Sequence, residues 1–313
     1  MSLRVVLFGT GSPLSLAALA AASRAAAVVA VVTPSGPPLR GVRSAVRRLA
    51  RRRATAPFRR LARGPGAEVL RFDAARLEAE LVRLAPDLLC VASFPRLLRP
   101  ALLETARFGA VGLHTSLLPR HRGPDPLFWT YFQDDREAGV TLYWLDAGED
   151  TGDLIDQESV PLARGRPVAE LYAELARRGA TLLERALPEI PAGRVARRPQ
   201  SSSQATREPR PDPRTCRIDW ESWSAERVFH VLGGLGEVYP LLADASGRPL
   251  RVGPVRRLLP QPHDRQPGTI ELDAGGLRVY CLHGVVEVSA ARSTPRMLRP
   301  LLAMPGWSRP RSG

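Results

Sequence analysis

The amino end of the chain carries a pattern that only a few folds accommodate. Residues 4–8 read RVVLF, a short β-branched run typical of a buried strand. A Gly-Thr-Gly-Ser-Pro turn follows at 9–13, where Ser12 is suited to cap a helix and Pro13 to begin it. An Ala-rich helix over 14–27 and a second apolar strand over 28–32 complete the pattern. A strand, a helix and a second strand in this order predict an α/β fold with a doubly wound, mostly parallel sheet.

Further apolar segments extend this sheet. Five-residue or shorter apolar runs predict strands over 88–92, 110–113 and 140–144, and helical spacing predicts helices over 77–84, 100–106 and 168–187. Beyond them lies a stretch rich in Arg, Pro, Ser and Gln, which fits a linker or an extended crossing segment. Short strands with Gly, Pro and Asp turns follow, over 250–255, 268–272, 277–282 and 285–289.

These patterns divide the chain into four parts. We expect an α/β domain over residues 1–190 and a linker over 191–215. A small β-rich domain over 216–300, either a barrel or a sandwich, and a basic tail over 301–313 complete the chain. The three cysteines are odd in number and share no ligand-like spacing, so we expect neither a disulfide framework nor a zinc cluster. With no convincing leader or membrane span, the expected location is the cytoplasm.

The basic residues are unusual in both type and distribution. All 45 are Arg, because the chain contains no Lys, and it also contains no Asn. The missing Lys excludes pyridoxal Schiff-base enzymes and P-loop NTPases, which need that side chain. Ten arginines and no acid fall between positions 40 and 63, in a chain of formal net charge +14. Clustered guanidinium groups without carboxylates suit a phosphate backbone, although a solvated Arg-rich face is the alternative.

One stretch carries the chemistry, between positions 111 and 153. His114 directly follows a buried strand, where open α/β sheets place their ligands. A Gly-containing loop with four acids, residues 146–153, follows the next predicted strand. A His and an Asp on two such loops predict an acid/base pair, His114 with Asp150.

The motifs in this stretch resemble those of the formyltransferases that use 10-formyltetrahydrofolate. The matching segments are Ser116-Leu117-Leu118-Pro119, Arg122-Gly123, Gly139-Val140-Thr141 and Asp150-Thr151-Gly152-Asp153. The amino end, the segment RRPQSSSQAT and a β-rich carboxyl end extend the resemblance from Arg4 to about Val288. Within the family the chain is most similar to the group that acts on methionyl-tRNA. The resemblance implies a Rossmann-like catalytic domain over residues 1–190, followed by a small β-barrel-like (OB-like) domain over 216–300.

The resemblance also implies roles for individual residues. His114 and Asp150 take the places of the catalytic His and Asp, whereas Gly112 stands where the family has a catalytic Asn. A backbone N–H, a water, Thr115 or Gln133 is left to replace that Asn as an oxyanion donor. Folate contacts are expected from Ser116, Leu117, Leu118, Pro119, Phe94, Asp146 and Gly152, and tRNA contacts from Arg40, Arg43, Arg47, Arg48 and Arg51.

Three functions remain open at this point. The first is formyl transfer from 10-formyltetrahydrofolate to initiator Met-tRNA by a monomeric enzyme that needs no metal. The second is formylation of a small amine, such as an amino sugar or a natural-product precursor. It is suggested by Gly112, by Thr115 where Pro is usual, and by the divergent segment 93–98. The third is a non-catalytic RNA- or folate-binding relative, because of Gly112.

Overall fold

The computed structural model describes residues 2–35, 53–64, 66–212, 215–243, 249–250, 252–273 and 275–290. The chain forms two compact units, each drawn from several segments. The first unit consists of Met1–Pro126, Ala138–Val160 and Tyr172–Glu208, and the second of Leu127–Glu137, Pro161–Leu171 and Pro209–Gly313. Among the residues that the structure describes, no helix combines the length and apolar character needed to cross a membrane.

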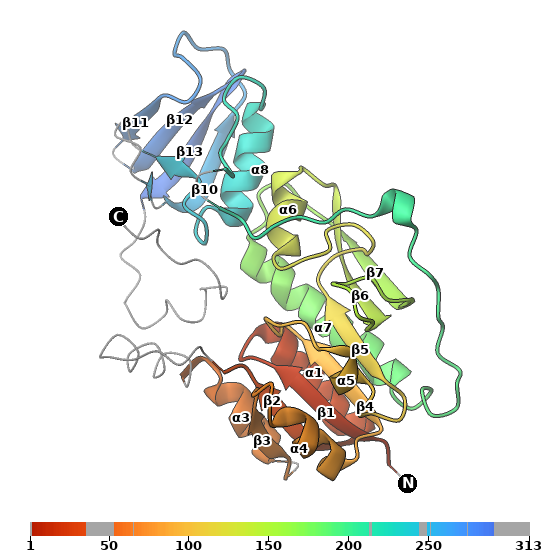
Figure 1. The fold of residues 1–313 in the computed structure, drawn as a ribbon. Coiled ribbons are helices and arrows are strands. Elements are labelled where there is room, and N and C mark those ends of the chain that lie inside the picture. The colour runs from red at the N-terminus through yellow and green to blue at the C-terminus, as the bar shows by residue number, and fades with distance from the viewer. Residues whose placement is uncertain are drawn as a thin grey trace. The chain divides into compact units, whose positions relative to one another are not determined.

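A seven-stranded sheet forms the centre of the first unit (Figure 1), in the order β3-β2-β1-β4-β5-β6-β7. The pairs from β3 across to β5 are parallel, and β6 runs antiparallel to β5. The expected doubly wound, mostly parallel sheet is therefore confirmed. The strands are β1 (Arg4–Gly9), β2 (Ala27–Thr33), β3 (Glu68–Arg71), β4 (Leu88–Ala92), β5 (Ala110–His114), β6 (Glu137–Trp144) and β7 (Leu154–Pro161).

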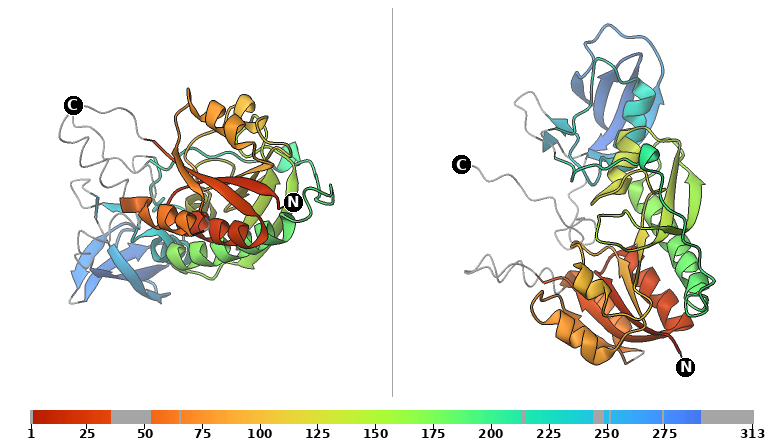
Figure 2. Two further views of the ribbon diagram at one scale, coloured as in Figure 1. Left: turned by 90° about the horizontal axis from the view of Figure 1, so that it is seen from below. Right: turned by 45° about the vertical axis from the view of Figure 1, so that its right-hand side comes forward.

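Helices cover both faces of this sheet (Figure 2). The helices of this region are α1 (Pro13–Ala25), α3 (Ala56–Arg63), α4 (Leu77–Leu84), α5 (Pro100–Leu103) and α7 (Val168–Ala186). On one face, the apolar sides of α4 and α5 pack on β1, β2 and β4 in one buried cluster. On the other face α1 packs on β1 and β2, and Gly179 of α7 approaches the side chains of Leu113 and Val140.

Local chemistry explains where two of these helices begin and end. The Ser12 hydroxyl accepts the Ser15 N–H at 3.2 Å, so α1 starts at Pro13 with a capped first turn. Helix α4 ends at Ala85, which adopts a left-handed φ of 43° ahead of Pro86. The helix expected over 100–106 is shorter, because the chain leaves the helix after Leu103 and Thr105 bonds back to the Leu102 carbonyl.

The second unit contains an antiparallel sheet of four strands in the order β10-β13-β12-β11. These strands are β10 (Val252–Leu259), β11 (Ile270–Asp273), β12 (Gly276–Cys281) and β13 (Gly284–Ala290). A short pair, β8 (Leu242–Ala243) with β9 (Pro249–Leu250), and the helices α6 (Pro126–Phe132) and α8 (Ala225–Leu235) accompany them. Aromatic contacts join α6 to the later segments, with ring centroids 4.8 Å apart for Phe128 and Tyr239. This sheet agrees with the expected small β-rich domain.

Candidate active site

His114 is the last residue of β5, and its side chain is buried. Alternation along the strand places Ala110, Gly112 and His114 on one face of the sheet. Ala110 packs in the α4 and α5 cluster, whereas Leu113 faces α7 on the opposite side. His114 therefore extends from the α4/α5 face where its strand ends, at the edge where parallel sheets bind ligands.

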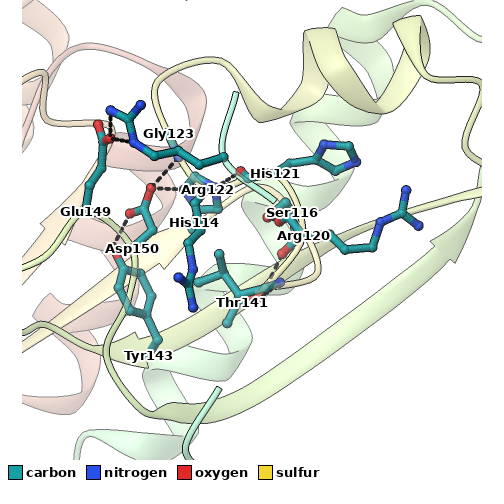
Figure 3. Close-up of polar contacts among 12 residues, drawn as sticks. His114, Ser116, Arg120, His121, Arg122, Gly123, Thr141, Tyr143, Glu149 and Asp150 are labelled. Carbon is teal, nitrogen blue, oxygen red and sulfur yellow. Dashed lines mark hydrogen bonds and ion pairs between the residues drawn. The ribbon is translucent and has the colours of Figure 1, made fainter. Parts of the chain in front are cut away.

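The hydrogen bonds of His114 define which ring nitrogen is reactive. Nε2 lies 2.8 Å from the main-chain oxygen of His121. Because a carbonyl oxygen only accepts hydrogen bonds, Nε2 must carry a hydrogen and donate it. Nδ1 is therefore the nitrogen that can gain and lose a proton, and it faces Oδ2 of Asp150 at 3.6 Å (Figure 3). This arrangement suits an imidazolium that is stabilised by a carboxylate.

Asp150 is held at several points. Its Oδ2 accepts the Gly123 N–H at 2.8 Å, and its Oδ1 accepts the Tyr143 hydroxyl at 2.6 Å. The residue has a left-handed φ of 57°, a conformation that Asp adopts more readily than most residues. The carboxylate consequently has a defined orientation toward His114, and sequence reasoning had not identified Tyr143 as one of its partners.

Tyr143 is buried and protonated. Burial, followed by the charge of Asp150, raises the pKa of the Tyr143 hydroxyl well above its ordinary value of 10. The nearby carboxylates of Asp146 and Glu149 act in the same direction. The hydroxyl therefore stays protonated at neutral pH and donates its hydrogen bond to Asp150.

A single threonine fixes the loop that follows His114. The Thr141 hydroxyl, from β6, donates to the main-chain oxygen of Ser116 at 2.7 Å and accepts the Leu118 N–H at 3.1 Å. Gln157 of β7 donates to the same hydroxyl at 2.9 Å. Within the loop, the Ser116 hydroxyl donates to the Arg120 carbonyl at 2.7 Å. The Ser-Leu-Leu-Pro segment is thus attached to two neighbouring strands.

Residues 200–206, part of the segment expected as a linker or a crossing segment, contact the loops of this site. Gln200 donates to the main-chain oxygens of Asp150 at 2.9 Å and Gly152 at 2.7 Å, and it accepts from the Arg122 guanidinium. Thr206 exchanges main-chain hydrogen bonds with Pro119 and Arg122. Sequence reasoning had not identified Gln200, although it lies inside the segment RRPQSSSQAT that contributed to the resemblance.

His121 links this segment to His114. The His121 N–H donates to the Thr206 hydroxyl at 2.8 Å, and its Nδ1 lies 3.2 Å from Oε1 of Glu208. Both side chains of the His121–Glu208 pair are buried. These contacts orient the His121 carbonyl, which in turn receives the hydrogen of His114.

The residues expected to contact folate lie in two places. Ser116, Leu118 and Gly152 lie in the two loops that carry His114 and Asp150 and are held there by Thr141 and Gln200, and Leu117 packs against Gly139. Asp146 accepts from Gly148 at 3.0 Å and Thr151 at 2.6 Å, which closes the acidic loop. Phe94 instead packs between Phe8 and Phe72, with centroids 5.4 and 5.5 Å away. Leu145 joins the two places. It packs against the cluster of Leu118, Tyr143 and Leu154 and also against the buried α4 and α5 cluster, on which Phe94 packs.

The remaining expectations concern the Asn replacement, the tRNA contacts and metals. Thr115 is buried next to His114, and Gln133 belongs to the second unit. The five arginines expected to contact tRNA, Arg40, Arg43, Arg47, Arg48 and Arg51, lie outside the described residues. Within the described ranges, no group of three or more His, Cys, Asp or Glu side chains is arranged to hold a metal ion.

Comparison with known proteins gives consistent results. The family described as Formyl transferase matches residues 3–187. Among curated proteins, the methionyl-tRNA formyltransferase of Anaeromyxobacter dehalogenans is 37% identical over 287 residues, covering 89% of this chain and 88% of its own. That of Halorhodospira halophila is 34% identical over 218 residues, covering 68% of each.

Solved structures show the same fold at lower identity. The N-formyltransferase of Helicobacter canadensis, in complex with folinic acid and dTDP-3-aminofucose, aligns with a TM-score of 0.65 at 16% identity. The alignment covers 93% of this chain and 99% of that one. Glycinamide ribonucleotide transformylase 1 of Symbiobacterium toebii aligns with a TM-score of 0.52 at 24% identity, over 64% of this chain and 93% of that one.

Proposed function

The chain belongs to the formyl transferase family, and from this premise we propose that it formylates the amino group of methionyl initiator tRNA, with 10-formyltetrahydrofolate as the donor. The observation that carries the proposal is the match to the Anaeromyxobacter enzyme, which is 37% identical over 287 residues. The family match covers residues 3–187, so an alignment of 287 residues extends well beyond the transferase domain. The proposal places the protein in the cytoplasm, where tRNA is charged.

The reaction needs a proton donor, a proton acceptor and no redox change. The folate supplies the formyl carbon: its bond to the folate nitrogen breaks, a bond to the amine forms, and one proton passes from the amine to the folate nitrogen. The residues at the end of β5 and in the acidic loop fit these needs. His114 offers a proton at Nδ1, and Asp150 offers a fixed carboxylate 3.6 Å away.

We assign distinct roles to the two side chains. At 3.6 Å from Asp150, Nδ1 of His114 lies beyond hydrogen-bond distance. The protonated ring can therefore donate its Nδ1 hydrogen to the oxygen on which negative charge develops, which is the largest single effect available to such a site. Asp150 stabilises the imidazolium and receives the amine proton, directly or through water. Its bonds from Tyr143 and Gly123 orient the carboxylate before substrate arrives.

The binding surfaces are assigned from the same loops. We assign the folate to the loop residues Ser116, Leu117, Leu118, Pro119, Asp146 and Gly152, with Phe94 at its apolar end. We assign the tRNA phosphates to Arg40, Arg43, Arg47, Arg48 and Arg51, in a segment of ten arginines without an acid. Because neutralised phosphates release counterions, tRNA affinity should fall steeply with salt.

The test is formylation of methionyl initiator tRNA by the purified full chain, read by mass after hydrolysis. His114→Ala is run beside the wild type, and His263→Ala is the matched control. His263 also uses Nε2 against main-chain oxygens, but it belongs to the second unit. We expect product from the wild type and His263→Ala, and a loss of about 10²-fold or more in His114→Ala.

A parallel arm offers a nucleotide-linked amino sugar in place of the tRNA. Product on the sugar amine with none on tRNA would overturn the tRNA assignment and support a small-amine enzyme. Product on tRNA that survives His114→Ala would overturn the assigned mechanism. The second measurement is the slope of log tRNA affinity against log salt concentration. The Arg43→Ala, Arg47→Ala double variant should reduce this slope by about two. The control double variant on helix α7, Arg177→Ala with Arg185→Ala, should leave the slope unchanged.

A further inference from the structure

Gly112 and Tyr143 lie directly opposite each other on β5 and β6. In an antiparallel pair, opposite residues share one face of the sheet. A Cβ at position 112 would lie 2.7 Å from Cε1 and 2.9 Å from Cζ of the Tyr143 ring, and 2.8 Å from Leu145. The ring therefore occupies the space that any side chain at position 112 would need.

The far end of the same ring reaches the candidate catalytic carboxylate. The Tyr143 hydroxyl donates to Oδ1 of Asp150 at 2.6 Å, while Oδ2 faces Nδ1 of His114 (Figure 3). Removing the side chain at position 112 thus allows an aromatic ring to cross the strand and place a donor on Asp150. The donor stands on the carboxylate oxygen that does not face the imidazole.

A buried tyrosine needs some acceptor, so the choice of acceptor is informative. Tyr131, which is also buried, donates its hydroxyl to the main-chain oxygen of Arg166 at 2.6 Å. Tyr143 instead donates to the ionisable side chain of Asp150. A neutral acceptor would have been enough to satisfy a buried hydroxyl. A hydrogen bond to a carboxylate is stronger than one to a neutral oxygen, and it fixes the carboxylate as well as the ring.

We propose that Gly112 and Tyr143 act together. Tyr143 is a positioning residue that holds the Asp150 carboxylate toward His114, and Gly112 provides the space that the Tyr143 ring requires. The inference rests on the proposed catalytic roles of His114 and Asp150. It also accounts for the absence of a polar side chain at position 112. The third polar group, beside His114 and Asp150, is the Tyr143 hydroxyl, which comes from the neighbouring strand β6.

The first test is Tyr143→Phe, which keeps the ring and removes only the hydroxyl. With the amine that the wild type formylates, we expect kcat to fall about 10- to 100-fold, the range expected for losing a hydrogen bond to a charged group. KM for the folate should stay within about twofold. Tyr131→Phe is the matched control, since it removes the hydroxyl of another buried tyrosine, in the second unit, with a hydrogen bond of the same length. It should lower Tm without lowering kcat.

The second test examines the space at position 112. Gly112→Ala should lower kcat as Tyr143→Phe does, because its methyl group displaces the ring. In a Tyr143→Leu background the same Gly112→Ala change should cost much less, so the double-mutant cycle should give a coupling of at least about fivefold in kcat. Additive effects would overturn the pairing of the two residues. Tyr143→Phe stands as the test if Gly112→Ala fails to fold.

A crystal structure of Tyr143→Phe separates this inference from the proposed function. We expect the Asp150 carboxylate to rotate away from His114 or to occupy several conformers. An unchanged, single Asp150 conformer together with unchanged kcat would overturn the positioning role. If the wild type formylates no amine offered, the proposed function fails, whereas the crystal structure still decides whether Tyr143 positions Asp150.

Discussion

The side-chain amide of Gln200 holds the main-chain carbonyl of Asp150 at a distance of 2.9 Å. The same nitrogen reaches the carbonyl of Gly152 at 2.7 Å, so one side chain spans the turn that presents the carboxylate. The Gln200 oxygen is engaged by the Arg122 guanidinium from the loop after β5. A segment remote in sequence therefore joins the two loops that supply His114 and Asp150.

Gln200→Ala should loosen this junction. Two main-chain acceptors and one guanidinium lose their partner, so we expect the free energy of unfolding to fall by about 1–2 kcal/mol and kcat by about tenfold. Gln204→Ala is the control, because Gln204 is exposed in the same segment. Urea unfolding and steady-state kinetics measure the two effects. Equal kinetics for both variants would contradict the role of Gln200.

Asp150 combines a charge with a left-handed backbone, and two substitutions separate these properties. Asp150→Asn keeps a residue that tolerates the φ of 57°, but it removes the charge that stabilises the imidazolium. We expect kcat to fall by about 10²-fold or more with little loss of stability. Asp150→Ala should lose as much activity and, in addition, about 1–2 kcal/mol of stability from backbone strain. Equal stability of the two variants would argue against that strain.

Elements whose structure is decided by apolar runs alone could be predicted from the sequence. The predicted strand over 88–92 and helix over 77–84 have the observed bounds, because each presents an uninterrupted apolar run or stripe. Strand β7 was not predicted, because its centre is polar. Glu158 in that strand forms an ion pair with Arg178 of α7 at 3.1 Å, a tertiary contact that no local pattern reveals.

The same distinction applies within the site. His114 could be predicted because it directly follows a buried strand, and Asp150 because it lies in a recognisable acidic loop. Tyr143 could not, since its position within an alternating strand is that of any half-buried aromatic residue. Only the register of β5 against β6 shows that it lies opposite Gly112. Long-range pairing of this kind depends on how the whole sheet assembles.

Gly152 should be intolerant of any side chain. A Cβ there would lie 1.9 Å from the main-chain oxygen of Trp144, which a rotamer change cannot relieve. We expect Gly152→Ala to lower the free energy of unfolding by about 2–3 kcal/mol, at the upper end for overpacking. Gly64→Ala is the control, because its nearest contact is 3.4 Å. A Tm for Gly152→Ala as high as that of the control would contradict this packing.

The second unit should lose stability in mild acid because of His230. Burial, followed by the positive charge of Arg164, lowers the pKa of His230 to about 4, from an ordinary value of 6.5. Its Nδ1 accepts the Gly165 N–H at 3.2 Å, which requires the neutral ring. The unfolded chain therefore binds a proton more readily than the folded chain between these two pH values. The stability due to neutral His230 is complete above about pH 6.5 and declines as the pH falls toward 4.

The size and origin of this decline can be measured. A shift of this size corresponds to at most about 3 kcal/mol between pH 7 and pH 4. Urea unfolding of the intact chain across that range should show the loss. His230→Phe keeps a ring that can stack on Tyr131, whose centroid lies 5.0 Å from that of His230, but it cannot bind a proton. It should therefore flatten the profile by a similar amount. A His230→Phe profile that stays as steep as the wild type would assign the acid sensitivity to other groups.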